Sequence, residues 1–337
     1  MKIKNTFILY VLLIFVLSAC GNNSPVNTPE TITLKINSST LTSYAPIFIA
    51  ESEGYFADAG IQMDYTKFNR TTEAVPLIIT GDLDIYAGSL NTGLLNILGQ
   101  EDNVKVVADR GHVASDDSCA YIGIMFRKDL YDSGEFTRPA DLAGRTIAPS
   151  KNGPSGYLIS LYLARAGLTF DDVTITDLPT SSYIDAMVNG TLDAVSTPEL
   201  NVSRLLNSGN AVLGVNGATE YGSLQTSVLV FGKNLLVDNR EAGIRFLTAY
   251  LRGVQQYNEG KTDRNVEIMV ENTGESAETL RSACWVTINS DGSIDFDASV
   301  SKYQQWNIEQ RYLDSPVTEE QFWDPSLLEN ALARLNQ

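Results

Sequence analysis

The amino-acid sequence predicts an α/β protein whose two lobes share one plan. Over residues 32–215, short β-branched runs alternate with stretches of helical periodicity, a pattern that favours parallel sheets. A helix–glycine–strand stretch occurs twice, and its glycines, Gly81 and Gly190, lie 109 positions apart. Upstream, the glycines that end two earlier helices, Gly60 and Gly167, lie 107 positions apart. Two matched offsets indicate an internal repeat and therefore two similar lobes.

The first lobe begins with a β-α-β unit. Residues 32–36 are typical of a strand, Pro46 stands early in the helix that follows, and a second strand runs over 61–65. The start of this helix presents unpaired backbone amides, to which Ser43 and Tyr44 add a hydroxyl and a ring. A small polar ligand could dock there; the alternative is that the hydroxyl residue only caps the helix.

The rest of the alternating region predicts the other strands and the boundaries of the lobes. Two β-rich runs without helical period, at 121–126 and 226–231, can each carry the chain from one lobe to the other. Beyond residue 239 the pattern is mainly helical. We therefore assign residues 32–124 plus 229–337 to lobe 1 and residues 125–228 to lobe 2.

The first 31 residues predict an anchor. Residues 1–19 carry Lys2 and Lys4 and an apolar run too short to span a bilayer, so we interpret them as a signal peptide. The Leu-Ser-Ala-Cys spacing that ends at Cys20 resembles a lipobox, in which the cysteine is acylated; the alternative is an ordinary signal peptide. Residues 20–31 are then a flexible tether. We expect a lipid-anchored protein at the cell membrane that faces the periplasm or the cell exterior.

Charge and cysteine content narrow the possible partners. The chain has 24 basic and 41 acidic residues, and loss of residues 1–19, which hold two lysines, makes the net charge −19. So acidic a surface argues against nucleic acid and anionic lipid headgroups as partners. Cys119 and Cys284 can form one disulfide or stay as two buried free thiols, and we favour the free thiols. No Cys or His cluster has metal-ligand spacing, so we expect neither metal nor cofactor.

The chain carries an ordered series of short motifs, which are Ala45-Pro46-x3-Ala50-x3-Gly54-Tyr55-Phe56-x3-Gly60-Ile61, Gly81-x-Leu83-Asp84-Ile85, Asp141-Leu142-x-Gly144, Gly167-Leu168 and Gly190-x-Leu192-Asp193-Ala194. This series resembles the periplasmic solute-binding proteins of ABC importers, in the group that binds sulfonates, nitrate and thiamine-type pyrimidines. The resemblance implies a type II periplasmic binding protein, with a ligand cleft between the lobes and two crossing strands. It also implies a small-molecule solute and delivery to ABC permease and ATPase subunits. We expect a monomer.

Open α/β sheets bind ligands beyond the carboxyl ends of their strands, so the candidate ligand-binding residues are those at equivalent strand ends. They are Ser43, Tyr44, Asn69, Arg70, Ser89, Asn91, Thr92, Asn152, Ser155, Tyr157, Thr197 and Glu199. Several have a simpler alternative, since serines can cap helices, Asn152 can shape a turn and Arg70 can be a solvated charge.

The expected solute depends on which charged group faces it. Glu199 would repel an anion and favour an amino group or ring N–H, and tyrosines offer flat faces, so we prefer a heteroaromatic vitamin precursor such as an aminopyrimidine or a flavin. The alternative is an aliphatic sulfonate, taurine or nitrate, for which Arg70 and Arg110 are the arginine candidates.

Two other functions compete with import. Some relatives in this superfamily make the thiamine pyrimidine, but they resemble a cysteine-rich template, whereas the mature chain has His112 as its one histidine, in a predicted loop. We therefore expect no enzyme. A receptor that passes its solute to a sensor kinase is the third possibility.

Overall fold

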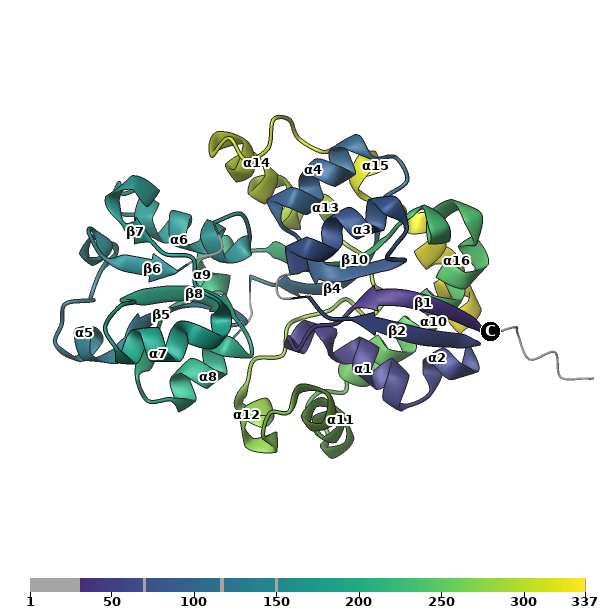
Figure 1. Cartoon of the computed structure of the whole chain (residues 1–337), viewed down its shortest axis with the longest axis horizontal. Coiled ribbons are helices and arrows are strands. Elements are labelled where there is room, and N and C mark those ends of the chain that lie inside the picture. Colours follow the sequence, from purple (N-terminus) through teal and green to yellow (C-terminus); the bar gives the residue numbers. More distant parts are fainter. Residues whose placement is uncertain (1–30, 69–70, 116–117, 149–150, 337) are drawn as a thin grey trace, which may run out of the picture.

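The structure is a computed structural model that describes residues 31–68, 71–115, 118–148 and 151–336. It confirms the predicted fold class, an α/β protein of two lobes (Figure 1). The predicted signal peptide, Cys20 and the tether lie outside the described residues, and so do Asn69 and Arg70.

Lobe 1 is built on a sheet of five strands among the described residues, in the order β2-β1-β3-β10-β4. The strands are β1 (Ile32–Asn37), β2 (Ile61–Thr66), β3 (Ile85–Ser89), β4 (Lys105–Val113) and β10 (Leu224–Phe231). β1 pairs in parallel with β2 and β3, whereas β10 runs antiparallel to both β3 and β4.

Lobe 2 has a second sheet, again of five strands in the described part of the chain, in the order β7-β6-β8-β5-β9. The strands are β5 (Ile122–Arg127), β6 (Thr146–Ala148), β7 (Thr174–Ile175), β8 (Ala194–Pro198) and β9 (Ala211–Asn216). β6 pairs in parallel with β7 and β8, and β5 runs antiparallel to β8 and β9. The two sheets therefore follow one plan, as the internal repeat predicts.

In each lobe, the strand that runs antiparallel to its neighbours is the first one after the chain crosses into that lobe: β5 in lobe 2 and β10 in lobe 1. The chain leaves lobe 1 after β4 and enters lobe 2 at β5, and it returns after β9 to form β10. The two β-rich runs of the sequence are thus a strand of lobe 2 and a strand of lobe 1.

Helices cover both faces of the sheets (Figure 1). In lobe 2 they are α5 (Lys128–Asp132), α6 (Pro154–Ala164), α7 (Tyr183–Val188), α8 (Asn201–Asn207) and α9 (Gly217–Tyr221). The first half of lobe 1 has α1 (Ala45–Ser52), α2 (Tyr55–Asp58), α3 (Val75–Thr80) and α4 (Thr92–Gln100). Its C-terminal part adds α10 (Arg240–Tyr257), α11 (Asp263–Thr273), α12 (Ala277–Ser282), α13 (Phe296–Ser299), α14 (Ser301–Glu309), α15 (Glu319–Phe322) and α16 (Pro325–Leu335).

The repeated Gly-x-Leu-Asp motif has a structural explanation in both lobes. Gly81 and Gly190 have φ of 78° and 70°, a left-handed conformation that favours glycine, and each ends a helix. Asp84 then accepts a hydrogen bond from the Lys35 amide of β1, and Asp193 accepts one from the Thr146 amide of β6. The motif therefore joins the end of a helix to the neighbouring parallel strand.

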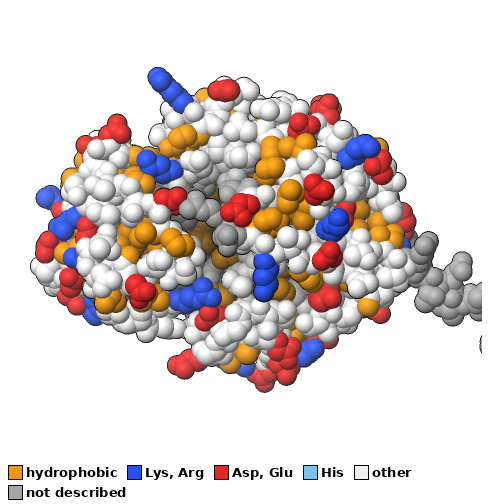
Figure 2. Space-filling view, viewed as in Figure 1, with side chains coloured by type: hydrophobic (Ala, Val, Ile, Leu, Met, Phe, Trp, Pro, Cys, Tyr) orange, Lys and Arg blue, Asp and Glu red, His pale blue; other side chains and the backbone are white. Residues whose placement is uncertain are grey.

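Figure 2 shows charged side chains of both signs interspersed on the face in view, with no large basic area there. The same view shows a recess where the two lobes meet. Within the ranges that the structure describes, no helix is both long enough and apolar enough to cross a membrane.

Candidate functional site

The predicted site residues that the structure describes come from both lobes, and one pair of them joins the lobes directly. Thr92 begins α4 of lobe 1, and its backbone N and Oγ1 donate to the Asn152 carbonyl oxygen of lobe 2 at 2.9 and 3.1 Å. The Thr92 hydroxyl also lies 2.5 Å from Oδ1 of Asn307, in α14. Asn152 makes this contact through its backbone carbonyl, and its side chain takes no part in it.

Aromatic residues of α6 and α14 form a second contact between the lobes. Tyr157 of α6 packs against Tyr221 of α9 and against Tyr303 and Trp306 of α14, with ring centroids 5.1–5.6 Å apart. The indole Nε1 of Trp306 donates to Ser160 Oγ at 2.8 Å. Because these rings pack on one another, Tyr157 serves the interlobe contact, the core use that tyrosines commonly have.

A group of buried polar residues, here called the crossing cluster, lies beside the first crossing: Ser43, Arg110, Tyr121, Glu199 and Cys284. Ser43 precedes α1, and its Oγ accepts a hydrogen bond from Arg110 Nη1 at 2.9 Å. Tyr121 stands just before β5, and its carbonyl oxygen accepts the Glu199 amide at 2.8 Å. Burial raises the pKa of Tyr121, while Ser43 and Arg110 act in the opposite direction. The cluster thus unites both lobes at the crossing.

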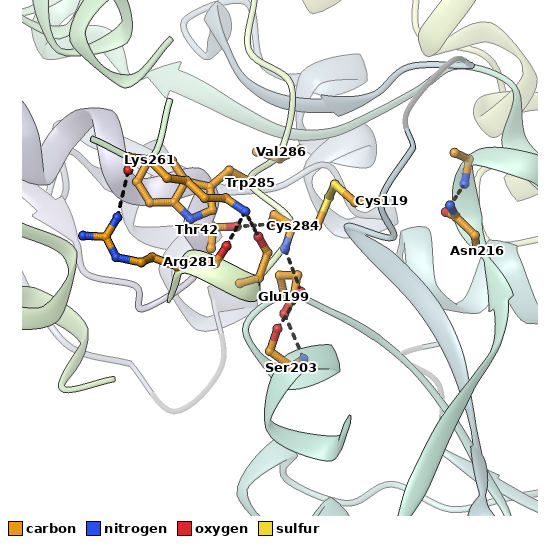
Figure 3. Close-up of a disulfide and its surroundings, with 12 residues drawn as sticks. Thr42, Cys119, Glu199, Ser203, Asn216, Lys261, Arg281, Cys284, Trp285 and Val286 are labelled. Carbon is orange, nitrogen blue, oxygen red and sulfur yellow. Dashed lines mark hydrogen bonds between the residues drawn. A yellow bond between two sulfur atoms is a disulfide. The ribbon is translucent and has the colours of Figure 1, made fainter. Parts of the chain in front are cut away.

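Both carboxylate oxygens of Glu199 accept hydrogen bonds from protein groups. Its Oε1 accepts hydrogen bonds from Ser203 Oγ and the Cys284 backbone N, both at 2.9 Å, and its Oε2 accepts the Ser203 amide at 3.0 Å. Burial raises the pKa of this carboxyl group, and the two amides and Lys261 oppose that shift. The carboxylate therefore caps α8 and reaches across to lobe 1 (Figure 3).

Cys119 and Cys284 form a disulfide, so the expectation of two free thiols is wrong (Figure 3). Cys119 belongs to the first crossing, and Cys284 starts a segment that pairs with β4 through Thr287. Two thiols 165 residues apart give no signal in the sequence that they lie together. The bond ties the crossing to lobe 1, next to Glu199.

The remaining predicted site residues are held by hydrogen bonds within the protein or buried in its packing. Tyr44 is buried, donates to the Asn37 carbonyl and lies under the guanidinium of Arg110. Asn91 is the N-cap of α4, and its side chain accepts the Leu94 amide. Helix capping is the simpler role that such residues can have instead of ligand binding. Thr197 Oγ1 accepts from Asn201. Ser89 has a carbonyl that accepts from Tyr86 and Asn91, and Ser155 is buried in the first turn of α6.

His112 lies in β4, so its prediction as a loop residue is wrong. Its Nδ1 is 2.8 Å from Asp109 Oδ2, and that carboxylate also accepts from the Asn289 amide and Gln225 Nε2. The pair is part of the packing between β4, β10 and the segment that follows Cys284. Among the described residues no group of His, Cys, Asp or Glu could hold a metal ion.

Two surface hollows lie away from the crossing. One is lined in lobe 2 by residues that include Arg127 and Asp132, and the other in lobe 1 by residues that include Tyr55 and Arg245. Neither hollow has a predicted site residue in its lining, as far as the described residues go. The interlobe contacts also use Trp306 and Asn307, which sequence reasoning missed because nothing near them in the chain marks them.

Two lobes on one plan, joined by two crossings and meeting at strand ends, define the fold of the periplasmic binding proteins. The chain belongs to the NMT1/THI5-like family, whose sequence pattern matches residues 41–259. A putative binding protein of Brucella abortus is 22% identical over 258 residues, in a match that covers 73% of this chain and 76% of the relative.

Solved structures share the fold at low identity. The ligand-binding component of an ABC-type import system from Staphylococcus aureus has a TM-score of 0.71 at 16% identity, covering 89% of this chain and 98% of its own. The alkanesulfonate-binding protein SsuA of Xanthomonas axonopodis has a TM-score of 0.67 at 16% identity, covering 88% and 99%.

An enzyme has the same fold as these binding proteins. The desulfurization enzyme DSZB has a TM-score of 0.64 at 18% identity, over 90% of this chain and 99% of its own. Fold alone therefore does not separate binding from catalysis, and the function has to be argued from the site.

Proposed function

We propose that this protein is the extracytoplasmic substrate-binding lipoprotein of an ABC-type importer, which takes up a small organic solute between its lobes and delivers it to a permease. The observation that carries the proposal is that residues from both lobes meet at the crossing, where Glu199 of lobe 2 accepts the Cys284 amide of lobe 1. A solute held by both lobes would favour the closed arrangement, since closure adds contacts that neither lobe makes alone.

Among solutes, the structure favours an oxyanion such as a sulfonate, taurine or nitrate over a heteroaromatic vitamin precursor. The preference for a heteroaromatic amine rests on Glu199, but both oxygens of this carboxylate already accept hydrogen bonds from Ser203 and Cys284. Tyr157, one of the tyrosines that could offer such a ring a flat face, packs against other aromatic side chains. Arg110, by contrast, is a buried cation at the crossing.

A binding screen tests this proposal. Calorimetry and thermal-shift measurements would compare taurine, alkanesulfonates and nitrate with aminopyrimidines, thiamine and riboflavin. We expect the first group to bind; saturable binding of the second group alone would overturn the choice of solute. If no compound of either group binds, the binding function itself is contradicted, and product formation from a sulfinate or a vitamin precursor would favour the enzyme.

The predicted anchor and partners need separate tests. Incorporation of labelled palmitate, lost in Cys20→Ala, would support lipidation. A neighbouring permease gene and ATPase gene would favour import, whereas a neighbouring sensor kinase gene would favour a signalling receptor.

A further inference from the structure

Arg110 is the most unusual buried group of this molecule. It lies in β4 with no exposed surface, in the crossing cluster. Its Nη1 donates to Ser43 Oγ at 2.9 Å, and its guanidinium lies over the Tyr44 ring at 5.5 Å. Its Nε and Nη2 have no hydrogen-bond partner among the residues that the structure describes. Buried guanidinium nitrogens are normally hydrogen-bonded, so two free ones in one side chain need an explanation.

In the part of the chain that the structure describes, no carboxylate forms an ion pair with this charge. The acidic neighbour in the chain, Asp109, accepts hydrogen bonds from the Gly111 amide, Gln225 and the Asn289 amide. In the described part of the chain, no ion pair includes Arg110. A buried charge without a partner is strongly unfavourable, and an anion bound beside it would remove that penalty.

The chemistry of the two free nitrogens indicates what the anion offers. Nε and Nη2 lie on the same edge of the planar guanidinium, where their N–H bonds point in parallel. Such an edge matches two oxygens of one group, as in a carboxylate, a sulfonate or nitrate. A neutral amide has one acceptor oxygen and would leave one of the two donors unpaired.

The surroundings favour a single negative charge on the ligand. The Ser43 hydroxyl, which accepts from the guanidinium, carries no charge, and Tyr121 interacts with both Ser43 and Arg110. A single guanidinium balances the one charge of a monoanion but not the two charges of a phosphate dianion.

We propose that the Nε–Nη2 edge of Arg110 is the anchor for a singly charged, two-oxygen group of the solute, which is a carboxylate, a sulfonate or nitrate. This inference rests on the proposed function and names the side chain that recognises the solute. Arg110 donates to Ser43, which precedes α1, and Tyr121, which stands just before β5, interacts with both residues. Because Arg110 has no exposed surface in this arrangement, a solute would reach the Nε–Nη2 edge when the lobes move apart.

The test follows the Arg110 side chain directly by NMR. The full mature chain, labelled with ¹⁵N-arginine, is titrated with sodium acetate, methanesulfonate or nitrate at constant ionic strength, with acetamide as the neutral control. The Nε–H resonance of Arg110 is assigned through its contact with the Tyr44 ring. We expect at least one anion to shift it saturably and acetamide to leave it in place. The exposed Arg165, paired with Glu220, is the internal control.

Substitutions then separate charge from geometry. Arg110→Lys keeps the charge but lacks the paired donors, so we expect the anion that shifts Arg110 to bind at least tenfold more weakly, with Arg165→Gln unchanged. If Arg110→Lys does not fold, the wild-type titration still decides. Equal shifts at Arg110 and Arg165, or no shift at Arg110 with any of the three anions, would overturn the anchor.

The anchor and the proposed function can fail separately. If a solute from the binding screen binds the protein while the Arg110 resonance stays in place, the anchor is wrong and the binding function stands. If acetate shifts Arg110 but no solute of the screen binds, the anion site stands and the importer function loses its support.

Discussion

Replacing Glu199 by alanine tests how the lobes are held together. The backbone amides of Ser203 and Cys284 would lose the carboxylate that accepts their hydrogen bonds, and both residues are buried. A buried amide without an acceptor costs about 1–3 kcal/mol. Removal of the carboxylate also relieves its own desolvation, which the raised pKa of Glu199 reports. We therefore expect Glu199→Ala to lower the free energy of unfolding by about 3 kcal/mol.

The two lost contacts act on different equilibria. The Ser203 contact lies within lobe 2 and affects folding alone, whereas the Cys284 contact joins the lobes. The Cys284 contact is worth about 1–2 kcal/mol. Its loss should therefore lower the population of the closed arrangement, and with it the apparent solute affinity, by about 5- to 30-fold.

The assay pairs urea unfolding with calorimetry on the solute found by screening. Ser203→Ala is the matched control, because it removes the hydroxyl contact to Glu199 and keeps the contact to Cys284. We expect it to leave solute affinity nearly unchanged. Unchanged affinity in Glu199→Ala as well would refute the interlobe role of this carboxylate.

The pH dependence of the wild type provides a further check on Glu199. The pKa of Glu199 in the folded state lies above its ordinary value of 4.5, so the folded state binds the proton more readily than the unfolded state. The stability that this titration contributes is therefore complete below about pH 4.5 and is lost as the pH rises through the folded-state pKa. Glu199→Gln should lack this dependence; an identical pH profile would contradict the argument.

Three further predictions concern stability. Double replacement of Cys119 and Cys284 by serine should lower the free energy of unfolding by about 3–5 kcal/mol in urea, because the bond closes a long loop; a loss below 1 kcal/mol would contradict this. Backbone hydrogen bonds from Thr137 and Arg138 lower the pKa of Asp141 to about 2, so the stability it adds is present above pH 3.8 and lost as the pH falls through about 2. Asp141→Asn should thus destabilise at pH 7, by up to about 1 kcal/mol, and not at pH 2. A Cβ at Gly253 of α10 would lie 2.2 Å from a backbone oxygen of α1, so Gly253→Ala should lower the thermal midpoint by several degrees; an unchanged midpoint would mean that the helices can separate there.

The fold could be predicted from the sequence because each of its β-α-β units leaves a pattern within a short stretch of the chain. Each β-α-β unit carries its own periodicity, and Gly81 and Gly190 mark helix ends through a backbone conformation that glycine adopts readily. The internal repeat then predicted two lobes, and the structure confirms that their sheets share one strand plan.

The site was less predictable because its contacts join distant residues. Arg110 and Ser43 are 67 positions apart, and Thr92 and Asn307 are 215 apart, so neither pairing leaves a trace in a short window of sequence. Glu199 was predicted as a ligand residue from its place after a strand, yet the same place puts it at the start of α8. A strand end thus marks where polar groups gather but does not distinguish a cap from a ligand contact.

A crystal structure with a bound solute tests the central claim most directly. We predict that the solute lies between the lobes, contacts residues of both, and has two oxygens against the Nε–Nη2 edge of Arg110. A solute bound within one lobe only, or in the hollow beside Tyr55, would contradict the account.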